Sequence, residues 1–260
     1  MVTTTIESYG DDPLQYVKTF HYDSDNHHRN IVFIHGGAWR DRRNTVDDFE
    51  LMIKYIHSNT RQFNLFSISY RLSPEIKHPY HLVDVIEALK WLNSHYGVLT
   101  TTLVGHSVGA TLCLQLLNYK TLLAEEDIVV DTEKLDIKLS KIFLLDGIFD
   151  LVKLVEEYGA PYQEFIDEAF ESEQQYKRAL QLSNDKFNVV GYSRDFESRL
   201  YIVYSLDDEL LSPRQHELLV DHYLKKFGVR VSVISGHWGL HEQMYKDDRV
   251  SQLILDSVDT

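Results

Sequence analysis

Short, continuous apolar runs recur along this chain, and stretches with helical spacing separate them. The runs are rich in Val, Ile, Leu, Phe and Tyr, and most do not alternate with polar residues. Strands that are buried on both faces of a parallel sheet have this pattern. The predicted strands cover residues 31–34, 65–69, 102–104, 142–145, 200–204 and 229–234. Residues 16–20 are expected to add an antiparallel edge strand.

Apolar positions at helical spacing predict helices over residues 80–96 and 213–227. Strands that alternate with helices favour an α/β class, a mostly parallel, doubly wound sheet with helices on both faces. The segment from about residue 151 to residue 198 departs from this alternation. It is rich in acidic and aromatic residues, and its apolar residues have helical spacing. We expect a small helical cap over the mouth of a site; extra helices on the flank of the sheet are the alternative.

The chain has 260 residues without a repeat or a Pro/Gly-rich linker, so we expect one domain over residues 1–260. Its 26 Lys and Arg stand against 40 Asp and Glu, a net charge of −14. Such a surface repels phosphate groups, so neither nucleic acid nor membrane is an expected partner. The one cysteine, Cys113, excludes an intrachain disulfide and is expected to be a small buried hydrophobe.

The location of the protein is suggested by what the sequence lacks. The first residues form neither a basic nor an apolar leader, and no run of about 18 apolar residues occurs. We therefore expect a cytoplasmic protein, which can also reach the nucleus by diffusion.

A G-x-S-x-G pattern follows the predicted strand 102–104 and precedes an apolar, helix-forming stretch; it runs from Gly105 to Gly109. In a strand–turn–helix context this pattern holds the serine in a strained turn that lifts its hydroxyl above the carboxyl ends of the strands. The glycines on both sides make so tight a turn possible. Ser107 is therefore the candidate nucleophile of a metal-free serine hydrolase.

A second pattern follows the predicted strand 31–34 directly: His35, Gly36, Gly37, Ala38, Trp39. Acyl transfer places negative charge on a carbonyl oxygen, and N–H donors must already be directed at that oxygen. We predict that the backbone N–H groups of Gly37, Ala38 and Val108 form this oxyanion hole. A simple strand-to-loop turn is the alternative for the glycine pair taken alone.

A serine hydroxyl becomes nucleophilic when a base takes its proton, and an acid fixes the tautomer of that base. Where the serine lies in such a strand–turn–helix, the order along the chain is serine, acid, histidine. The candidate acids after the strand 200–204 are Asp207, Asp208 and Glu209, and the candidate bases after the strand 229–234 are His237 and His241. Spacing alone does not choose within either group.

His237 and His241 are four residues apart, a spacing that can hold a metal ion when it lies on a helix. Gly239 between them favours a loop, and no set of Cys or carboxylate residues completes a coordination shell. We expect neither a metal nor a cofactor.

With these residues in place, the chain resembles the kynurenine formamidases of the α/β-hydrolase type, in particular the fungal enzymes of tryptophan breakdown. The HGGxW and G-x-S-x-G patterns are shared with many esterases and support the superfamily. The hexapeptide at the serine, together with the Asp146 and Asp208 segments, points to the narrower group. The matching segments are 35–39, 70–75, 105–110, 144–148, 208–211 and 239–241.

The resemblance implies the α/β-hydrolase fold and the hydrolysis of N-formyl-L-kynurenine to L-kynurenine and formate. It implies Asp208 as the acid and His241 as the base. It also implies a homodimer, with the small-molecule substrate and water as the other partners. Candidate aromatic walls of the substrate pocket are Trp39, Tyr70, Phe149 and Trp238, with core packing as the alternative for Tyr70 and Phe149. The rate is expected to fall as the base protonates, near or below its ordinary pKa of about 6.5.

Two other functions remain open. A general carboxylesterase acting on small acyl esters would use the same machinery. A non-catalytic binding protein of the hydrolase fold is the second alternative, but such proteins usually lack a member of the serine–acid–histidine triad, and candidates for all three are present here.

Overall fold

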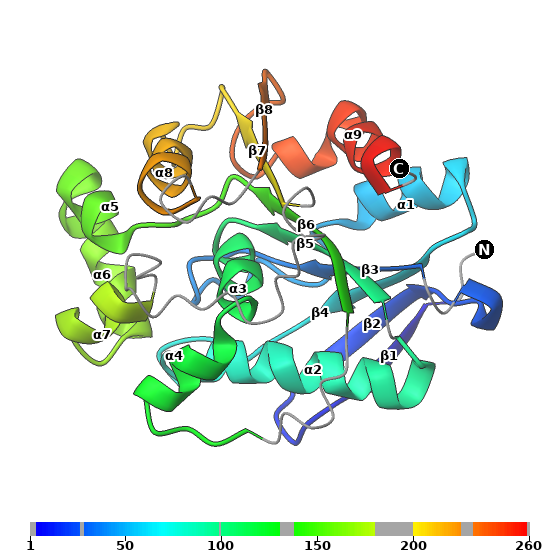
Figure 1. Ribbon diagram of the computed structural model, residues 1–260, viewed down its shortest axis with the longest axis horizontal. Coiled ribbons are helices and arrows are strands. Elements are labelled where there is room, and N and C mark those ends of the chain that lie inside the picture. The colour runs from blue at the N-terminus through cyan, green and yellow to red at the C-terminus, as the bar shows by residue number, and fades with distance from the viewer. Residues whose placement is uncertain are drawn as a thin grey trace.

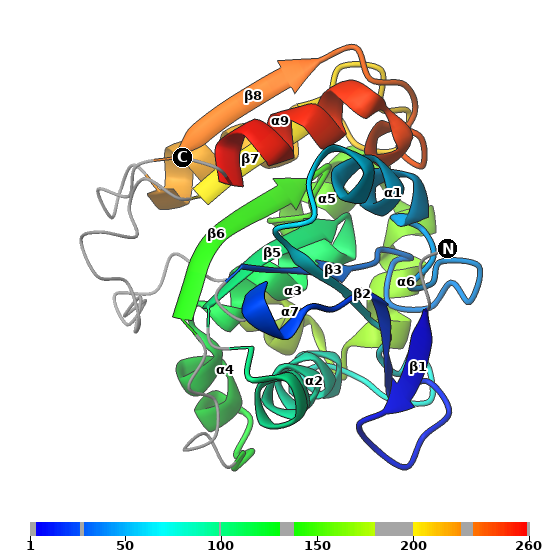
Figure 2. The same cartoon turned by 90° about the vertical axis from the view of Figure 1, so that its right-hand side faces the viewer.

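The computed structural model describes residues 4–26, 29–98, 100–130, 138–179, 200–224 and 231–258. An eight-stranded sheet with the order β1-β2-β4-β3-β5-β6-β7-β8 forms its centre (Figure 1). The strands turn progressively from β8 to β1, the usual twist of an open sheet (Figure 2). Helices cover both faces, so the predicted doubly wound α/β architecture is confirmed.

The parallel strands coincide with the predicted apolar runs. They are β3 (Asn30–Ile34), β4 (Asn64–Ile68), β5 (Thr100–His106), β6 (Lys138–Leu145), β7 (Leu200–Ser205) and β8 (Ser232–Gly236). Of the last predicted run, residues 229 and 230 lie outside the described residues. Both β3 and β4 are buried at every position, which explains why their sequences do not alternate.

The antiparallel part of the sheet differs from the prediction in one respect. The strand β2 (Tyr16–His21) is antiparallel to β4, as expected. It is not the edge strand, because β1 (Thr5–Ser8) pairs with its outer side. The prediction of an edge at residues 16–20 is therefore wrong. The residues of β1 are mostly exposed, so the strand has no apolar run that could reveal it.

Side chains of alternate residues enter two separate cores. On β3, Val32 and Ile34 belong to the cluster beneath α2 (Tyr80–Tyr96), α3 (Val108–Leu116) and α4 (Tyr119–Glu125). Ile31 and Phe33 belong to the cluster beneath α1 (Glu50–Asn59) and α9 (Asp248–Val258). No helix of the described ranges combines the length and apolar character needed to cross a membrane.

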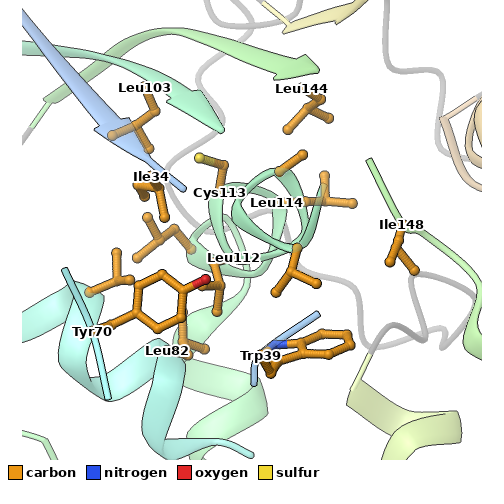
Figure 3. Packing of buried hydrophobic residues seen from close by; sticks show 14 of the residues in the cluster. Ile34, Trp39, Tyr70, Leu82, Leu103, Leu112, Cys113, Leu114, Leu144 and Ile148 are labelled. Atoms are coloured by element: carbon orange, nitrogen blue, oxygen red, sulfur yellow. The ribbon is translucent and has the colours of Figure 1, made fainter. Parts of the chain in front are cut away.

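The helix α3 is buried at every residue, because strands and helices surround it. Cys113 on this helix is fully buried and faces the strands that carry Ile34 and Leu103 (Figure 3). The expectation of a small buried hydrophobe at residue 113 is confirmed. Within the predicted helix 213–227 the structure has α8 (Arg214–Leu218) and a π-helical continuation, η3 (Leu219–Leu224), and residues 225–227 lie outside the described residues.

Three helices follow β6 at one end of the sheet: α5 (Leu151–Tyr158), α6 (Ala160–Ala169) and α7 (Glu173–Ala179) (Figure 1). The hydroxyl of Tyr162 donates to the carbonyl of Leu210 at 2.5 Å, and the ring of Phe165 lies 6.2 Å from that of Trp39. The helical part of the predicted insertion therefore contacts the loops after β3 and β7. Residues 180–198 lie outside the described residues, and the role of a cap stays a prediction.

Candidate functional site

Ser107 occupies the turn between β5 and α3, with a φ of +53° and a ψ of −120°. This strained conformation persists because the glycines on both sides let the chain pass closely. A Cβ atom on Gly105 would lie 2.3 Å from the carbonyl oxygen of Gly109. A Cβ atom on Gly109 would lie 2.0 Å from the carbonyl oxygen of Ile34 on β3. The tight turn itself therefore requires Gly105, and its packing against β3 requires Gly109.

The loop after β3 has three consecutive residues with positive φ: Gly37 at +97°, Ala38 at +48° and Trp39 at +60°. The carbonyl of Gly37 is engaged, because it accepts the N–H groups of Arg40 (2.9 Å) and Asp41 (2.8 Å). Within the described part of the chain, the N–H groups of residues 37, 38 and 108 are not paired with any acceptor. The three donors predicted for the oxyanion hole are thus available to a ligand.

Gly36 brings this loop against the candidate nucleophile. A Cβ atom on Gly36 would lie 2.9 Å from the Cβ of Ser107. The hydroxyl of Tyr70 donates toward the carbonyl oxygens of His35 (2.9 Å) and Gly36 (3.1 Å), and its ring stacks on the ring of His35. Tyr70 therefore holds the loop from behind. The next residue, Arg71, forms a bidentate ion pair with Asp84 of α2, which fixes the segment after β4.

Asp208 and His241 form a buried pair at the carboxyl ends of β7 and β8. Nδ1 of His241 lies 2.7 Å from Oδ2 of Asp208, and the two side chains are 4% and 1% exposed. The other oxygen of Asp208 accepts the N–H groups of Leu210 and Leu211. Because the carboxylate accepts a hydrogen bond from the N–H at Nδ1, that nitrogen keeps its proton and Nε2 of the imidazole is the basic nitrogen.

The neighbouring acid and histidine form a second pair, at the surface. Nδ1 of His237 lies 2.7 Å from Oδ1 of Asp207, but the two side chains are 72% and 39% exposed. The sequence could not distinguish these two pairs by spacing. Burial now distinguishes them, because Asp208 and His241 lie inside the molecule, whereas Asp207 and His237 are open to water.

His241 lies next to the serine turn. The residue before Ser107 is His106, whose Nε2 donates to the carbonyl of His241 at 3.0 Å, and the two rings are 4.5 Å apart. The hydroxyl of Ser205, at the end of β7, donates to the carbonyl of Gly239 at 2.6 Å and joins the acid loop to the histidine loop. The structure therefore brings together residues 35–39, Ser107, Asp208 and His241 at one edge of the sheet.

Curated relatives match this chain over nearly its whole length. The kynurenine formamidase of Meyerozyma guilliermondii is 43% identical over 260 residues, which cover 99% of this chain and 95% of that protein. The kynurenine formamidase of Debaryomyces hansenii is 38% identical and covers 97% of this chain and 99% of its own. That of Saccharomyces cerevisiae is 32% identical, with 92% of each chain covered. The chain belongs to the kynurenine formamidase family.

Two further comparisons agree with this family. The BD-FAE family, a group of α/β hydrolases, matches residues 20–222. The crystal structure of esterase B from Lactobacillus rhamnosis superposes with a TM-score of 0.73 at 17% identity, covering 99% of this chain and 85% of that chain. Carboxyl esterase 2 of Tuber melanosporum gives a TM-score of 0.65 at 17% identity, with 98% and 85% covered. At such low identity these structures show the fold alone, which is the α/β-hydrolase fold.

The aromatic residues predicted to line a pocket of this formamidase family member are all buried. Tyr70 and Phe149 are 0% exposed, Trp39 is 1% exposed and Trp238 is 9% exposed. Trp39 packs edge to face against Phe170, with ring centroids 5.3 Å apart. Tyr70 supports the loop after β3, a contact that core packing explains. Contact between any of the four rings and a substrate stays a prediction.

Sequence reasoning predicted no supporting role for four residues of the formamidase site, although it named Glu209 as a candidate acid and Asp146 as part of a matching segment. Glu209 accepts the backbone N–H of His241 at 2.8 Å, and His106 and Ser205 make the contacts described above. A fourth is Asp146, which follows β6 and is fully buried. The sequence offers one signal for Asp146, since it lies at the carboxyl end of a parallel strand, where ligands bind in such sheets.

Three residues whose side chain types can bind a metal ion lie close together in the part of the chain that the structure describes. They are His106, Asp146 and His241, and one possible ligand atom from each lies within 4.8 Å of the others. All three residues are buried, and His241 is already hydrogen-bonded to Asp208. The two histidines considered as metal ligands from the sequence make separate contacts. His237 pairs with Asp207 at the surface, and His241 pairs with Asp208 inside the molecule.

Proposed function

We propose that this chain hydrolyses N-formyl-L-kynurenine to L-kynurenine and formate, with Ser107, His241 and Asp208 as its triad. The observation that carries this proposal is the match with curated kynurenine formamidases over nearly the full length of both chains. The buried Asp208–His241 pair beside the strained serine turn supports it independently. The esterase alternative rests on structures that share the fold alone.

In this mechanism His241 takes the proton of Ser107, and the serine oxygen attacks the formyl carbon. The carbonyl oxygen becomes negative and is stabilised by the N–H groups of Gly37, Ala38 and Val108, each donor contributing about 3 kcal/mol to the transition state. Asp208 orients the imidazole and stabilises it once it is charged. His241 then gives its proton to the departing aniline nitrogen. Water attacks the formyl-serine ester, with His241 again as the base, and formate leaves.

The substrate proposal is tested by comparing kcat/KM on N-formyl-L-kynurenine with kcat/KM on p-nitrophenyl acetate. An aryl amine leaves less readily than p-nitrophenolate, so a general esterase would favour the activated ester by orders of magnitude. We expect the formamide to be the better substrate, with release of formate and kynurenine in equal amounts. A large preference for the ester would favour the carboxylesterase alternative. Failure to turn over either substrate would favour a binding protein.

The activity is expected to fall as the pH decreases, and the fall should begin above pH 6.5. Burial lowers the pKa of His241, but the hydrogen bond and the charge of Asp208 outweigh burial, so the pKa is raised above its ordinary value. As the pH falls through this raised pKa, the imidazole takes up a proton and no longer acts as a base. The sequence-based expectation of a value near or below 6.5 is corrected by this contact. A profile of kcat/KM that stays flat down to about pH 5 would contradict the assignment of the base.

The assembly and location of the protein complete the proposal. We propose a homodimer in the cytoplasm, on the basis of the family resemblance and of the acidic composition. Light scattering after size-exclusion chromatography tests the assembly, and a fluorescent fusion tests the location. A monomer at micromolar concentration would overturn the first statement.

A further inference from the structure

Asp146 lies directly after β6 with a φ of +39°, in the left-handed region that residues other than glycine seldom adopt. Two contacts with β7 hold it there. Its N–H donates to the carbonyl of Val203 at 3.0 Å, and its Oδ1 accepts the N–H of Ser205 at 2.8 Å. Strained backbone that neighbouring strands hold in place is concentrated at functional positions.

The carboxyl group of Asp146 is directed into the triad region. Its second oxygen, Oδ2, is buried and forms no hydrogen bond with the residues that the structure describes. One carboxyl oxygen of Asp146 lies within 4.8 Å of a ring nitrogen of His241 and of a ring nitrogen of His106. The imidazole of His241 therefore has two carboxyl groups near it, Asp208 after β7 and Asp146 after the adjacent strand β6.

The surroundings of Asp146 hold its carboxyl group in the neutral form at neutral pH. Burial, followed by the negative charge of Asp208, raises the pKa of Asp146 to about 8. The charge of Glu209 acts in the same direction, and His241 acts in the opposite one. Carboxyl groups that share one site do not readily ionise together, because each charge opposes the other. Asp146 thus keeps its proton at neutral pH.

We propose that Asp146 is a positioning residue of this site, a second carboxyl group that faces His241 beside Asp208 and stabilises the imidazolium when Asp146 carries a charge. This inference rests on the proposed function, in which His241 is the base. Asp146 acts through His241 and not on the substrate. Its ionisation is favoured under two conditions, when removal of the charge of Asp208 lowers its pKa and when the pH exceeds that pKa. Each condition gives a separate test.

The first test is a double-mutant cycle with Asp208→Ala and Asp146→Asn. Alanine removes the charge at residue 208 without placing an amide donor against Nδ1 of His241. Asparagine at residue 146 keeps the oxygen that accepts the N–H of Ser205. We expect Asp146→Asn to reduce kcat/KM by about threefold in the parent protein and by about tenfold or more in the Asp208→Ala background. Equal fold-changes in the two backgrounds would overturn the proposal.

The cycle is also measured as the rate at which a fluorophosphonate labels Ser107. Labelling reports the nucleophile without requiring the proposed substrate, so a failure of the formamidase assignment and a failure of the Asp146 proposal are distinguishable. The matched control is Asp207→Asn, a carboxyl that pairs with His237 at the surface. It should have the same small effect in both backgrounds. If Asp207→Asn reduced the rate in the Asp208→Ala background as much as Asp146→Asn does, the effect would be one of charge in general, and the proposal would be overturned.

The second test is the pH profile. The titratable groups that face the carboxyl of Asp146 are His106 from β5, Asp208 and Glu209 from the loop after β7, and His241. We expect kcat/KM of the parent protein to rise again through an ionisation near pH 8, and this step should be absent from Asp146→Asn. A purely structural residue would not produce such a step. Persistence of the step in Asp146→Asn would overturn the proposal.

The third test is stability against pH, which also checks that the variants fold. A carboxyl that is protonated in the folded protein and ionised in the unfolded chain lowers stability as the pH rises from about 4 to about 8. Asparagine does not titrate, so Asp146→Asn should lose this component. We expect its Tm to exceed that of the parent at about pH 7.5 by more than at about pH 4. An identical difference at both values would mean that the folded protein holds Asp146 ionised, and the proposal would fail.

Discussion

Ser107→Ala is expected to reduce kcat/KM for N-formyl-L-kynurenine by about 10⁴-fold or more while the fold remains intact. The substitution removes only the hydroxyl oxygen, and alanine needs the same backbone conformation as the serine it replaces. Without that oxygen no covalent bond to the formyl carbon forms. The remaining N–H donors can then assist only a direct attack by water. Formate release measures the activity, and thermal unfolding checks the fold.

Ser94→Ala is the matched control for this experiment. Ser94 is exposed on α2, and its hydroxyl donates to the carbonyl of Trp91 one turn earlier. We expect activity within about twofold of the parent, because a surface substitution of this kind is close to neutral. A fluorophosphonate should label the parent and the Ser94 variant but not Ser107→Ala. Near-normal turnover by Ser107→Ala would mean that another group is the nucleophile.

Gly109→Ala is expected to lower the free energy of unfolding by about 3 kcal/mol or more, near the upper end of what overpacking does. The new methyl group would lie 2.0 Å from the carbonyl oxygen of Ile34 and 2.6 Å from that of His35. Both atoms belong to the backbone of a buried strand and its exit, so neither can move aside as a flexible side chain would. The helix α3 must shift away from β3, which moves the serine turn with it. Urea denaturation measures the loss, and labelling of Ser107 should decrease in the fraction that still folds.

Gly97→Ala separates this clash from the effect of glycine conformation. Gly97 ends α2 with a φ of +62°, and a Cβ atom there would meet nothing within 4 Å. Only the backbone strain of a left-handed alanine remains, about 1–2 kcal/mol. Activity per folded molecule should not change. Equal destabilisation by the two substitutions would contradict the argument from close packing.

The sheet could be predicted from the sequence because burial determines its strands. Runs such as residues 31–34 are apolar throughout, since helices cover both of their faces. The strand β1 was not predicted, because the residues of Thr5–Ser8 are mostly exposed and their composition resembles that of a loop. The π-helical turn at Leu219–Leu224 was not predicted either. A π-helix differs from an α-helix in its hydrogen-bond register, which the pattern of apolar residues does not reveal.

The sequence could predict which strand each site residue follows, but not which of two neighbouring candidates belongs to the site. Ser107 and the loop 35–39 have local sequence patterns, because their backbones need glycine at fixed positions. The choice between Asp207 and Asp208 has no such pattern. It depends on which carboxylate turns inward, and that is decided by hydrogen bonds to Leu210 and Leu211 within the loop. Asp146 had a position but no role, since a lone acid at a strand end acquires its chemistry from the residues that surround it.

The left-handed stretch at residues 37–39 has a consequence for the energetics of each catalytic cycle. In water, solvent dipoles must rotate before they can meet a newly formed charge, and that rotation contributes to the barrier. Amide dipoles that backbone torsions already lock in place do not need to rotate. For the proposed reaction, the reorganisation is completed during folding, and successive formyl groups meet the same polarised surroundings. Tetrahedral inhibitors such as boronates should accordingly bind without rearrangement of this loop.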